Sequence, residues 1–284
     1  MNSSTLPRPE IVFFDVGDTL MRVKPSWTGV YLRVCREFGL EIEEPVLAGA
    51  FARALREGLW DEDGPFEAKP ETSYQRVKVF DTRAMELAGH PGLPDAFFRA
   101  IAVEFARGAS WHVFPDVHPT LAVLEQAGIR RAVISNWVWV LPELLHEVDL
   151  AEHFEAIVAS ARVGYQKPQR EIFQHALDLT GVAAPHAIHV GDTPGADARG
   201  ARSVGIRPVL IDRYGRHPDG LPDQPDVLIV ADLAALLDLL GLDAAEVRRA
   251  EAFSSGSDPF AWAARVSPES AARSGAATPA GGQE

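Results

Sequence analysis

The sequence has little of three features that would each point to a different class of protein. It has one cysteine, Cys35, so it cannot form an internal disulfide, and we expect a reducing compartment. No apolar run approaches the roughly 18 uninterrupted residues of a membrane-spanning helix, and residues 1–10 lack the pattern of a signal peptide. Basic residues are too few to balance the acids, and the formal net charge of -13 argues against a nucleic acid or an anionic membrane as partner. These absences predict a soluble, cytoplasmic protein that binds neither nucleic acid nor membrane.

The remaining composition is that of an ordinary globular protein. The chain has 284 residues, of which 46% are hydrophobic and 24% charged, enough for one large domain or two modest ones. The acidity does not exclude an anionic substrate, because a lysine and a metal ion can invert the field at one site.

A short apolar run at residues 11–14 ends abruptly at Asp15, at the start of a turn that contains Gly17. Its β-branched and aromatic residues indicate a strand buried inside a parallel sheet. Asp15 is then expected at the carboxyl edge of the sheet, where open α/β sheets bind their ligands.

Three later apolar runs also end in polar residues. They are 132–134 before Ser135 and Asn136, 156–159 before a loop with Lys167, and 187–190 before Gly191 and Asp192. The carboxyl ends of parallel strands lie on one edge of a sheet. We therefore expect an acid, a hydroxyl, an amide, a lysine and a second acid to converge there.

The pattern of periodicity divides the chain into three parts. Helical spacing without a convincing strand fills residues 22–111, strands alternate with helices over residues 112–242, and beyond Asp243 the composition shifts to alanine, serine, glycine and proline. This order predicts an α/β fold with a doubly wound, Rossmann-like parallel sheet built from residues 1–21 and 112–242. Residues 22–111 form an all-helical insertion in this interpretation, and residues 243–284 a disordered tail without an assigned role.

Together these motifs resemble the haloacid dehalogenase-like (HAD) superfamily of hydrolases, in the subfamily I with a helical cap inserted after the first strand. The resemblance covers residues 9–240 and rests on four motifs. They are Phe14 to Leu20, Ile134-Ser135-Asn136, Lys167-Pro168 ahead of a helix, and Gly191-Asp192-Thr193 followed by Asp197. Each is weak alone, but all four in this order at the ends of strands are specific.

The resemblance implies a Mg²⁺-dependent phosphatase of a small phosphorylated metabolite. Asp15 would be the nucleophile that forms an aspartyl-phosphate, and Lys167 would neutralise the developing charge. Asp15, Asp192 and the carbonyl of Gly17 would hold Mg²⁺, and Asp197 would either support these ligands or contact the metal weakly. The residues implied to bind phosphate are Ser135, Asn136 and Thr19, the last of which also suits a role in bracing the turn.

Gly17 is a departure from the family pattern. Phosphatases of this family usually place a second aspartate there, which protonates the leaving oxygen and is worth roughly 10² to 10⁴ in rate. Asp18 is adjacent, but alternation along an extended backbone predicts that its side chain points to the other face. Two alternatives therefore stay open, a catalytically weak HAD-like binding or regulatory protein and a 2-haloacid dehalogenase, although Asp192 argues against the latter because such dehalogenases lack this metal motif.

The sequence is less informative about substrate and assembly. The helical insertion would select the substrate through side chains such as Trp27, Tyr31, Trp60 or Tyr74. A monomer and a homodimer are both compatible with the sequence.

Overall fold

The computed structural model describes residues 6–59 and 64–255, with side chains up to Glu251. They form two compact units, the first made of residues 6–23, 64–73 and 106–255 and the second of residues 24–59 and 74–105. Every site residue predicted from the sequence lies in the first unit.

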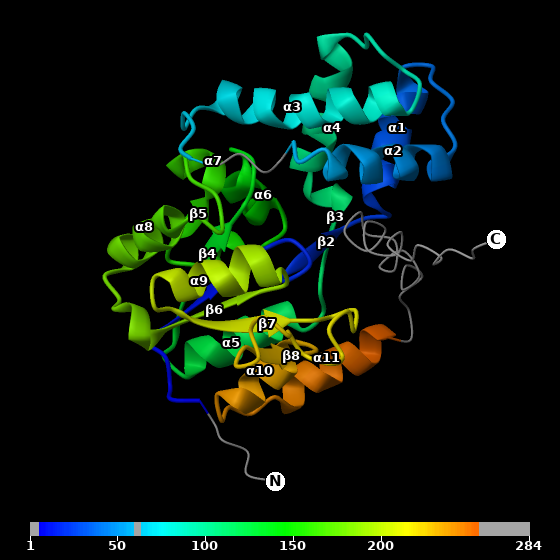
Figure 1. The fold of residues 1–284 in the computed structure, drawn as a ribbon. Helices are drawn as coiled ribbons and strands as arrows, with labels where there is room; N and C mark the ends of the chain where they lie inside the picture. The colour runs from blue at the N-terminus through cyan, green and yellow to red at the C-terminus, as the bar shows by residue number, and fades with distance from the viewer. Residues whose placement is uncertain (1–5, 60–63, 256–284) are drawn as a thin grey trace, which may run out of the picture. The chain divides into compact units, whose positions relative to one another are not determined.

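A six-stranded parallel sheet with the order β5-β4-β1-β6-β7-β8 is the centre of the first unit (Figure 1). The strands are β1 (Ile11–Phe14), β4 (Arg130–Ser135), β5 (Ile157–Ala159), β6 (Ala187–Gly191), β7 (Arg207–Ile211) and β8 (Leu228–Val230). Strand β1 is buried along its whole length and pairs with β4 on one side and β6 on the other. The predicted α/β fold is confirmed, and Asp15 leaves the sheet between two strands that also end in site residues.

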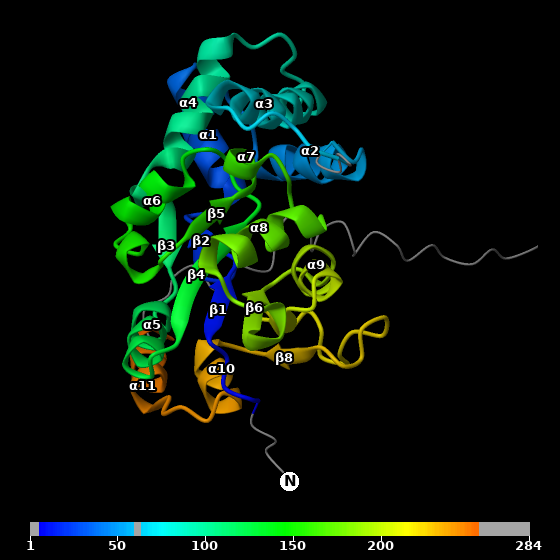
Figure 2. The same cartoon turned by 90° about the vertical axis from the view of Figure 1, so that its left-hand side faces the viewer.

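Helices cover both faces of this sheet, α8 and α9 on one face and α5, α10 and α11 on the other (Figures 1 and 2). On the α8 face, Phe13 and Ile134 of the sheet share one buried cluster with Phe173 of α8. The helices of this unit are α5 (Val117–Gln126), α6 (Leu141–Glu147), α7 (Ser160–Val163), α8 (Arg170–Thr180), α9 (Gly200–Ser203), α10 (Leu233–Leu239) and α11 (Ala245–Ser255). Shorter turns are the 3₁₀ turns Gly108–Ser110, Ala151–His153 and Ala184–His186, and a π-helical turn at Pro194–Arg199.

Two features of this unit differ from the sequence prediction. Strands β2 (Met21–Val23) and β3 (Trp111–Val113) pair antiparallel where no strand was expected, because three residues are too few to show a period. The prediction of disorder from Asp243 is wrong for α11, which packs against α5 and α10 and buries Val247 completely. Alanine-rich composition does not distinguish a packed helix from a solvated tail. The rest of the predicted tail, residues 256–284, lies outside the described residues.

The second unit is helical in its described residues. Its helices are α1 (Trp27–Glu37), α2 (Glu44–Arg56), α3 (Pro70–Leu87, whose first turn belongs to the first unit) and α4 (Asp95–Ala106). They enclose a buried core that includes Tyr31, Leu47, Phe51, Phe80, Met85, Phe97 and Ile101. Its role as a cap over the site remains a prediction.

The side chains proposed to select substrate differ in burial and contacts. Tyr31 is buried, and its hydroxyl donates to Asp81 Oδ1 at 2.5 Å, so it is a core residue. The hydroxyl of Tyr74 donates to the Asp95 carboxylate at 2.7 Å, whereas Trp27 is 40% exposed. Trp60 lies outside the described residues.

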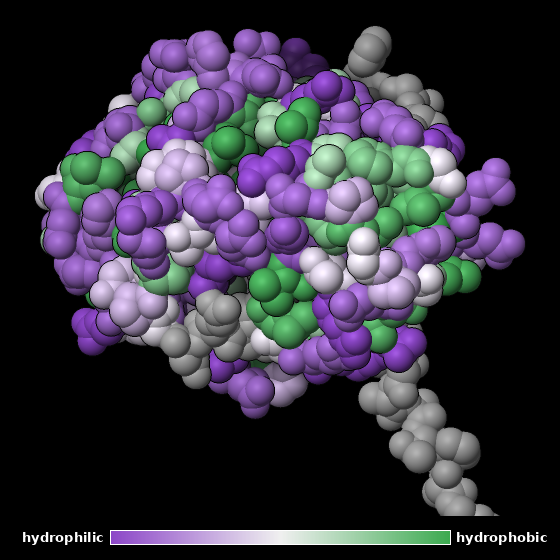
Figure 3. Space-filling view, turned by 90° about the horizontal axis from the view of Figure 1, so that it is seen from above, coloured by the Kyte–Doolittle hydropathy of each residue, from purple (hydrophilic) through white to green (hydrophobic). Residues whose placement is uncertain are grey.

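The surface shown in Figure 3 has hydrophobic residues in separate patches among hydrophilic ones, the usual pattern of a folded protein. Within the described ranges, no helix combines the length and apolar character needed to span a membrane.

Candidate functional site

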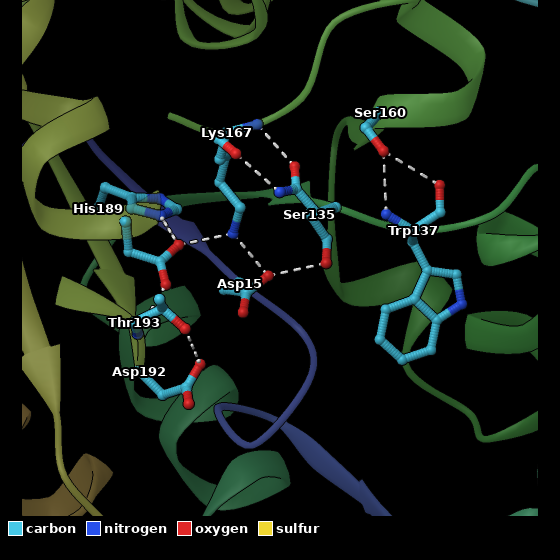
Figure 4. Close-up of polar contacts among 10 residues, drawn as sticks. Asp15, Ser135, Trp137, Ser160, Lys167, His189, Asp192 and Thr193 are labelled. Atoms are coloured by element: carbon cyan, nitrogen blue, oxygen red, sulfur yellow. Dashed lines mark hydrogen bonds and ion pairs between the residues drawn. The ribbon is translucent and has the colours of Figure 1, made fainter. Parts of the chain in front are cut away.

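Asp15 is fixed at the carboxyl edge of the sheet, because its backbone N–H donates to the carbonyl of Val190 in β6 at 2.8 Å. Its carboxylate oxygen Oδ1 accepts a hydrogen bond from the hydroxyl of Ser135, at the end of β4, at 2.7 Å (Figure 4). The same oxygen lies 2.7 Å from Nζ of Lys167. No described residue donates a hydrogen bond to Oδ2, so one oxygen is held and the other is left for a ligand.

Lys167 is a buried cation between two carboxylates, 2.7 Å from Oδ1 of Asp15 and 2.6 Å from Oδ1 of Asp197. Burial by itself lowers the pKa of an ammonium group, but Asp15 and Asp197 together raise the pKa of Lys167 above its usual value. The side chain therefore stays charged next to Asp15, as the sequence motif suggested.

Asn136 has a different position from the one expected of a phosphate ligand. Its Nδ2 donates to the carbonyl of Lys167 at 2.8 Å, and its Oδ1 accepts from the backbone N–H of the same residue at 2.6 Å. Both ends of the amide thus hold the Lys167 backbone, so Asn136 positions the lysine. An amide can pair with backbone or ligand alike, and its identity in the sequence does not say which.

Thr19 is completely buried, and no described group pairs with its hydroxyl. This burial favours the bracing role over a phosphate contact. Its carbonyl accepts two hydrogen bonds from the Arg213 guanidinium, at 2.7 and 3.1 Å, and Arg213 also pairs with buried Asp116.

Asp197 anchors the second acidic motif. Its Oδ1 accepts from Lys167 and lies 2.8 Å from Nε2 of His189, and its Oδ2 accepts from the backbone N–H of Thr193 at 2.9 Å. Burial acts to raise its pKa, but Lys167 and His189 hold the pKa of Asp197 below the usual range. A glycine is required at 191, because a Cβ there would lie 2.2 Å from Cγ of Asp197.

Asp192 lies directly after β6 and has fewer hydrogen-bond partners than Asp197. Its Oδ1 accepts from the Thr193 hydroxyl at 3.3 Å and its Oδ2 from Arg216 at 2.9 Å. Burial, and then the negative charges of Asp18 and Asp15, raise the pKa of Asp192 well above its usual value, and Arg216 opposes them. The site is therefore short of positive charge at this carboxylate.

Asp18 faces this cluster, contrary to the alternation expected from the sequence. Its backbone has φ 52°, in the left-handed region, and the alternation of side chains holds only for extended backbone. Its Oδ1 accepts from the hydroxyl of Tyr214 at 2.9 Å. Burial and the nearby charge of Asp15 raise the pKa of Asp18, while Tyr214 and Arg216 act to lower it.

Sequence reasoning missed the loop after β7, which supplies Arg213, Tyr214 and Arg216. Asp212 shapes this loop by accepting from the backbone N–H groups of Arg216 and His217 at 2.8 and 2.7 Å. The loop contacts the turn after Asp15 through Thr19 and Asp18, and it reaches Asp192 through Arg216. No motif in the sequence identifies these side chains, because the contacts depend on the course of an irregular loop.

The residues at this edge suit a hard divalent cation. Oxygens of Asp15, Asp192 and Asp197 lie within 4.8 Å of one another. The four carboxylates, including Asp18, face two cationic side chains, Lys167 and Arg216, so one divalent ion would balance the charge. Asp197 is held by three short contacts, from Lys167, His189 and the Thr193 N–H, whereas Asp192 has one weak contact at 3.3 Å and one ion pair, so Asp15 and Asp192 are the better ligands.

Comparison with known proteins identifies the family. A family model for haloacid dehalogenase-like hydrolases matches residues 9–205. The chain belongs to this family of hydrolases. It is 31% identical over 220 residues to haloacid dehalogenase-like hydrolase domain-containing protein 3 of Danio rerio, covering 77% of this chain and 91% of that protein. It is 36% identical over 260 residues to phosphoserine phosphatase of Thermus thermophilus, covering 79% and 96%.

A likeness to solved structures supports the HAD fold. The structure of YfnB from Bacillus subtilis, a putative HAD-hydrolase determined with magnesium bound, superposes with a TM-score of 0.67 at 18% identity. The match covers 83% of this chain and 100% of that chain. At this identity the likeness shows the fold alone.

Proposed function

We propose that this HAD hydrolase is a Mg²⁺-dependent phosphatase of small phosphorylated metabolites that uses Asp15 as nucleophile. The observation that carries the proposal is the asymmetry of the Asp15 carboxylate. Oδ1 is held by Ser135 and Lys167, while Oδ2 receives no hydrogen bond from the described residues. A phosphoserine phosphatase among the relatives agrees with phosphoryl chemistry.

In this proposal, the Asp15 carboxylate attacks phosphorus through the oxygen that does not bind the metal, and the bond from phosphorus to the leaving oxygen breaks, which gives an aspartyl-phosphate. Water then hydrolyses this intermediate, releasing inorganic phosphate and restoring the carboxylate. Lys167 neutralises charge on the transferring group, while Asn136 and Asp197 hold Lys167 in place. Mg²⁺ bound by Asp15, Asp192 and the predicted Gly17 carbonyl would supply the missing positive charge and polarise a phosphate oxygen.

The proposal is tested by measuring phosphate release from phenyl, acetyl and ethyl phosphate, with Mg²⁺ and with a chelator. We expect release that requires Mg²⁺, fastest for the two activated compounds because Gly17 offers no proton donor. Mg²⁺ binding without any release would favour the binding protein. Metal-independent halide release from a 2-haloacid would favour the dehalogenase.

Arg216→Gln is expected to strengthen Mg²⁺ binding about tenfold, or about 1.4 kcal/mol, because a guanidinium no longer competes for Asp192. Calorimetric titration measures this affinity without relying on turnover. Arg207→Gln removes an equal charge at the exposed start of β7, at the opposite edge of the sheet, and serves as the control. Weaker binding in Arg216→Gln would mean that Arg216 holds Asp192 in place for the metal.

Gly17→Asp is expected to raise turnover of ethyl phosphate about tenfold or more, because general acid catalysis is worth roughly 10² to 10⁴. A Cβ at position 17 would lie 3.4 Å from Cζ3 of Trp137, an ordinary contact, and Gly17 does not have a left-handed backbone. Gly17→Asn has the same shape without an acid. Equal rates for the Asp and Asn variants would contradict the prediction.

A further inference from the structure

Trp137 is a half-buried aromatic residue next to the nucleophile turn. Its backbone is anchored after β4, where its N–H donates to Oγ of Ser160 at 3.1 Å and its carbonyl accepts from the same hydroxyl at 3.3 Å. Figure 4 shows the indole extending from this anchored segment. The indole packs against the ring of Trp111, with the ring centroids 4.9 Å apart and the planes at 50°.

The indole of Trp137 lies next to Gly17, in the turn that follows Asp15. A Cβ built on Gly17 would meet Cζ3 of Trp137 at 3.4 Å and no other heavy atom within 4 Å. Backbone conformation does not require glycine there, since the residue lies outside the left-handed region. Because Gly17 has no side chain, a carbon edge of the Trp137 indole borders the turn at this position, two residues after Asp15.

The chemistry of this border is unlike that around Oδ1 of Asp15. Lys167 and Ser135 crowd Oδ1 with hydrogen-bond donors, whereas Gly17 and the indole carbon edge offer neither a proton nor a charge. An aromatic ring packed there can meet this edge in the edge-to-face arrangement that aromatic pairs favour. Its oxygen has to depart without a proton from a side chain at position 17, which selects leaving groups of low basicity.

We propose that Trp137, supported by Trp111, binds the leaving group of the substrate, and that this group is a planar aromatic ring joined to phosphate through oxygen. This inference rests on the proposed function, and it names aryl phosphate monoesters as the substrate class. Attack by Asp15 breaks the bond from phosphorus to the aryl oxygen, the aryloxide takes the electron pair, and a proton from water completes the phenol.

Binding of non-hydrolysable probes tests the surface apart from turnover. With Mg²⁺ present, phenylphosphonate is expected to bind at least about tenfold more tightly than methylphosphonate, measured by calorimetry. Trp137→Leu should reduce this ratio to about twofold, while Trp137→Phe should keep most of it. Trp139→Leu, which removes a tryptophan two residues along the same segment, should leave the ratio unchanged.

The outcomes separate this inference from the proposed function. A ring preference that depends on Trp137 without phosphate release from any ester would support the surface and reject the phosphatase. Phosphate release with equal binding of the two phosphonates, or with a ratio that survives Trp137→Leu, would reject the surface and keep the phosphatase. If Trp137→Leu fails to fold, Trp137→Phe decides the question. A Trp137→Phe variant that binds phenylphosphonate no more tightly than methylphosphonate overturns the proposal.

Discussion

Replacing Asp15 with asparagine is expected to lower phosphate release from phenyl phosphate by at least about 10³-fold. The amide has the shape of the carboxylate but is a poor nucleophile, so the covalent step is lost while the fold is kept. Lys167 retains its ion pair with Asp197 at 2.6 Å, which limits the disturbance around the buried ammonium. The measurement is the initial rate at saturating Mg²⁺, with the thermal midpoint recorded to show that the variant is folded.

Trapping of the intermediate gives a second readout for the same variant. After acid quenching during turnover, the natural protein should contain a peptide that includes Asp15 and one added phosphoryl group, which Asp15→Asn lacks. Asp178→Asn removes an exposed carboxylate on α8 and should leave both the rate and the labelling unchanged. Labelling at another residue, or a rate in Asp15→Asn within about tenfold of the natural protein, would contradict the assignment of the nucleophile.

The sequence alone predicted the positions of the candidate site residues that lie at strand ends. Asp15, Ser135 and Asp192 each lie where an apolar run stops, and parallel pairing of β4, β1 and β6 brings those ends to one edge. Lys167 was harder to place, because a loop separates it from β5, but the parallel topology still predicted that it would reach this edge. Parallel topology therefore predicted that these four residues would meet at one edge.

Other features depended on local geometry that composition does not show. The left-handed backbone of Asp18 turned its carboxylate toward the cluster, where alternation predicted the opposite face. Arg216 reaches Asp192 from a loop 24 residues farther along the chain, and no motif marks it. Asn136 has the amide expected of a ligand, but both its ends pair with the Lys167 backbone.

Asp81→Asn is expected to stabilise the helical unit at neutral and alkaline pH. Asp81 is buried in the core of that unit, where burial raises its pKa to about 7 despite the hydrogen bond from Tyr31. Relative to the ordinary value of 3.8, this difference corresponds to about 4 kcal/mol of unfolding free energy. That contribution is absent below about pH 4, where the carboxyl is protonated in both states. The penalty grows as the pH rises to about 7, because the unfolded chain releases its proton first, and is constant above that.

Calorimetric unfolding of the natural protein and Asp81→Asn between pH 4 and pH 9 tests this dependence. Relative to the natural protein, the variant should gain up to about 4 kcal/mol as the pH rises from 4 to about 7. Amide hydrogens without an acceptor cost roughly 1 to 3 kcal/mol at every pH, so the net gain above pH 7 is smaller by that amount. Asp95→Asn is the contrasting control, since hydrogen bonds from Lys78, Tyr74 and Arg99 lower the pKa of that exposed carboxylate, and its removal should destabilise instead. The prediction is contradicted if the difference in unfolding free energy between Asp81→Asn and the natural protein is the same at pH 4 and pH 8. Asp81 would then ionise in the folded core as readily as in the unfolded chain, and the hydrogen bond from the Tyr31 hydroxyl would be enough to stabilise a buried charge.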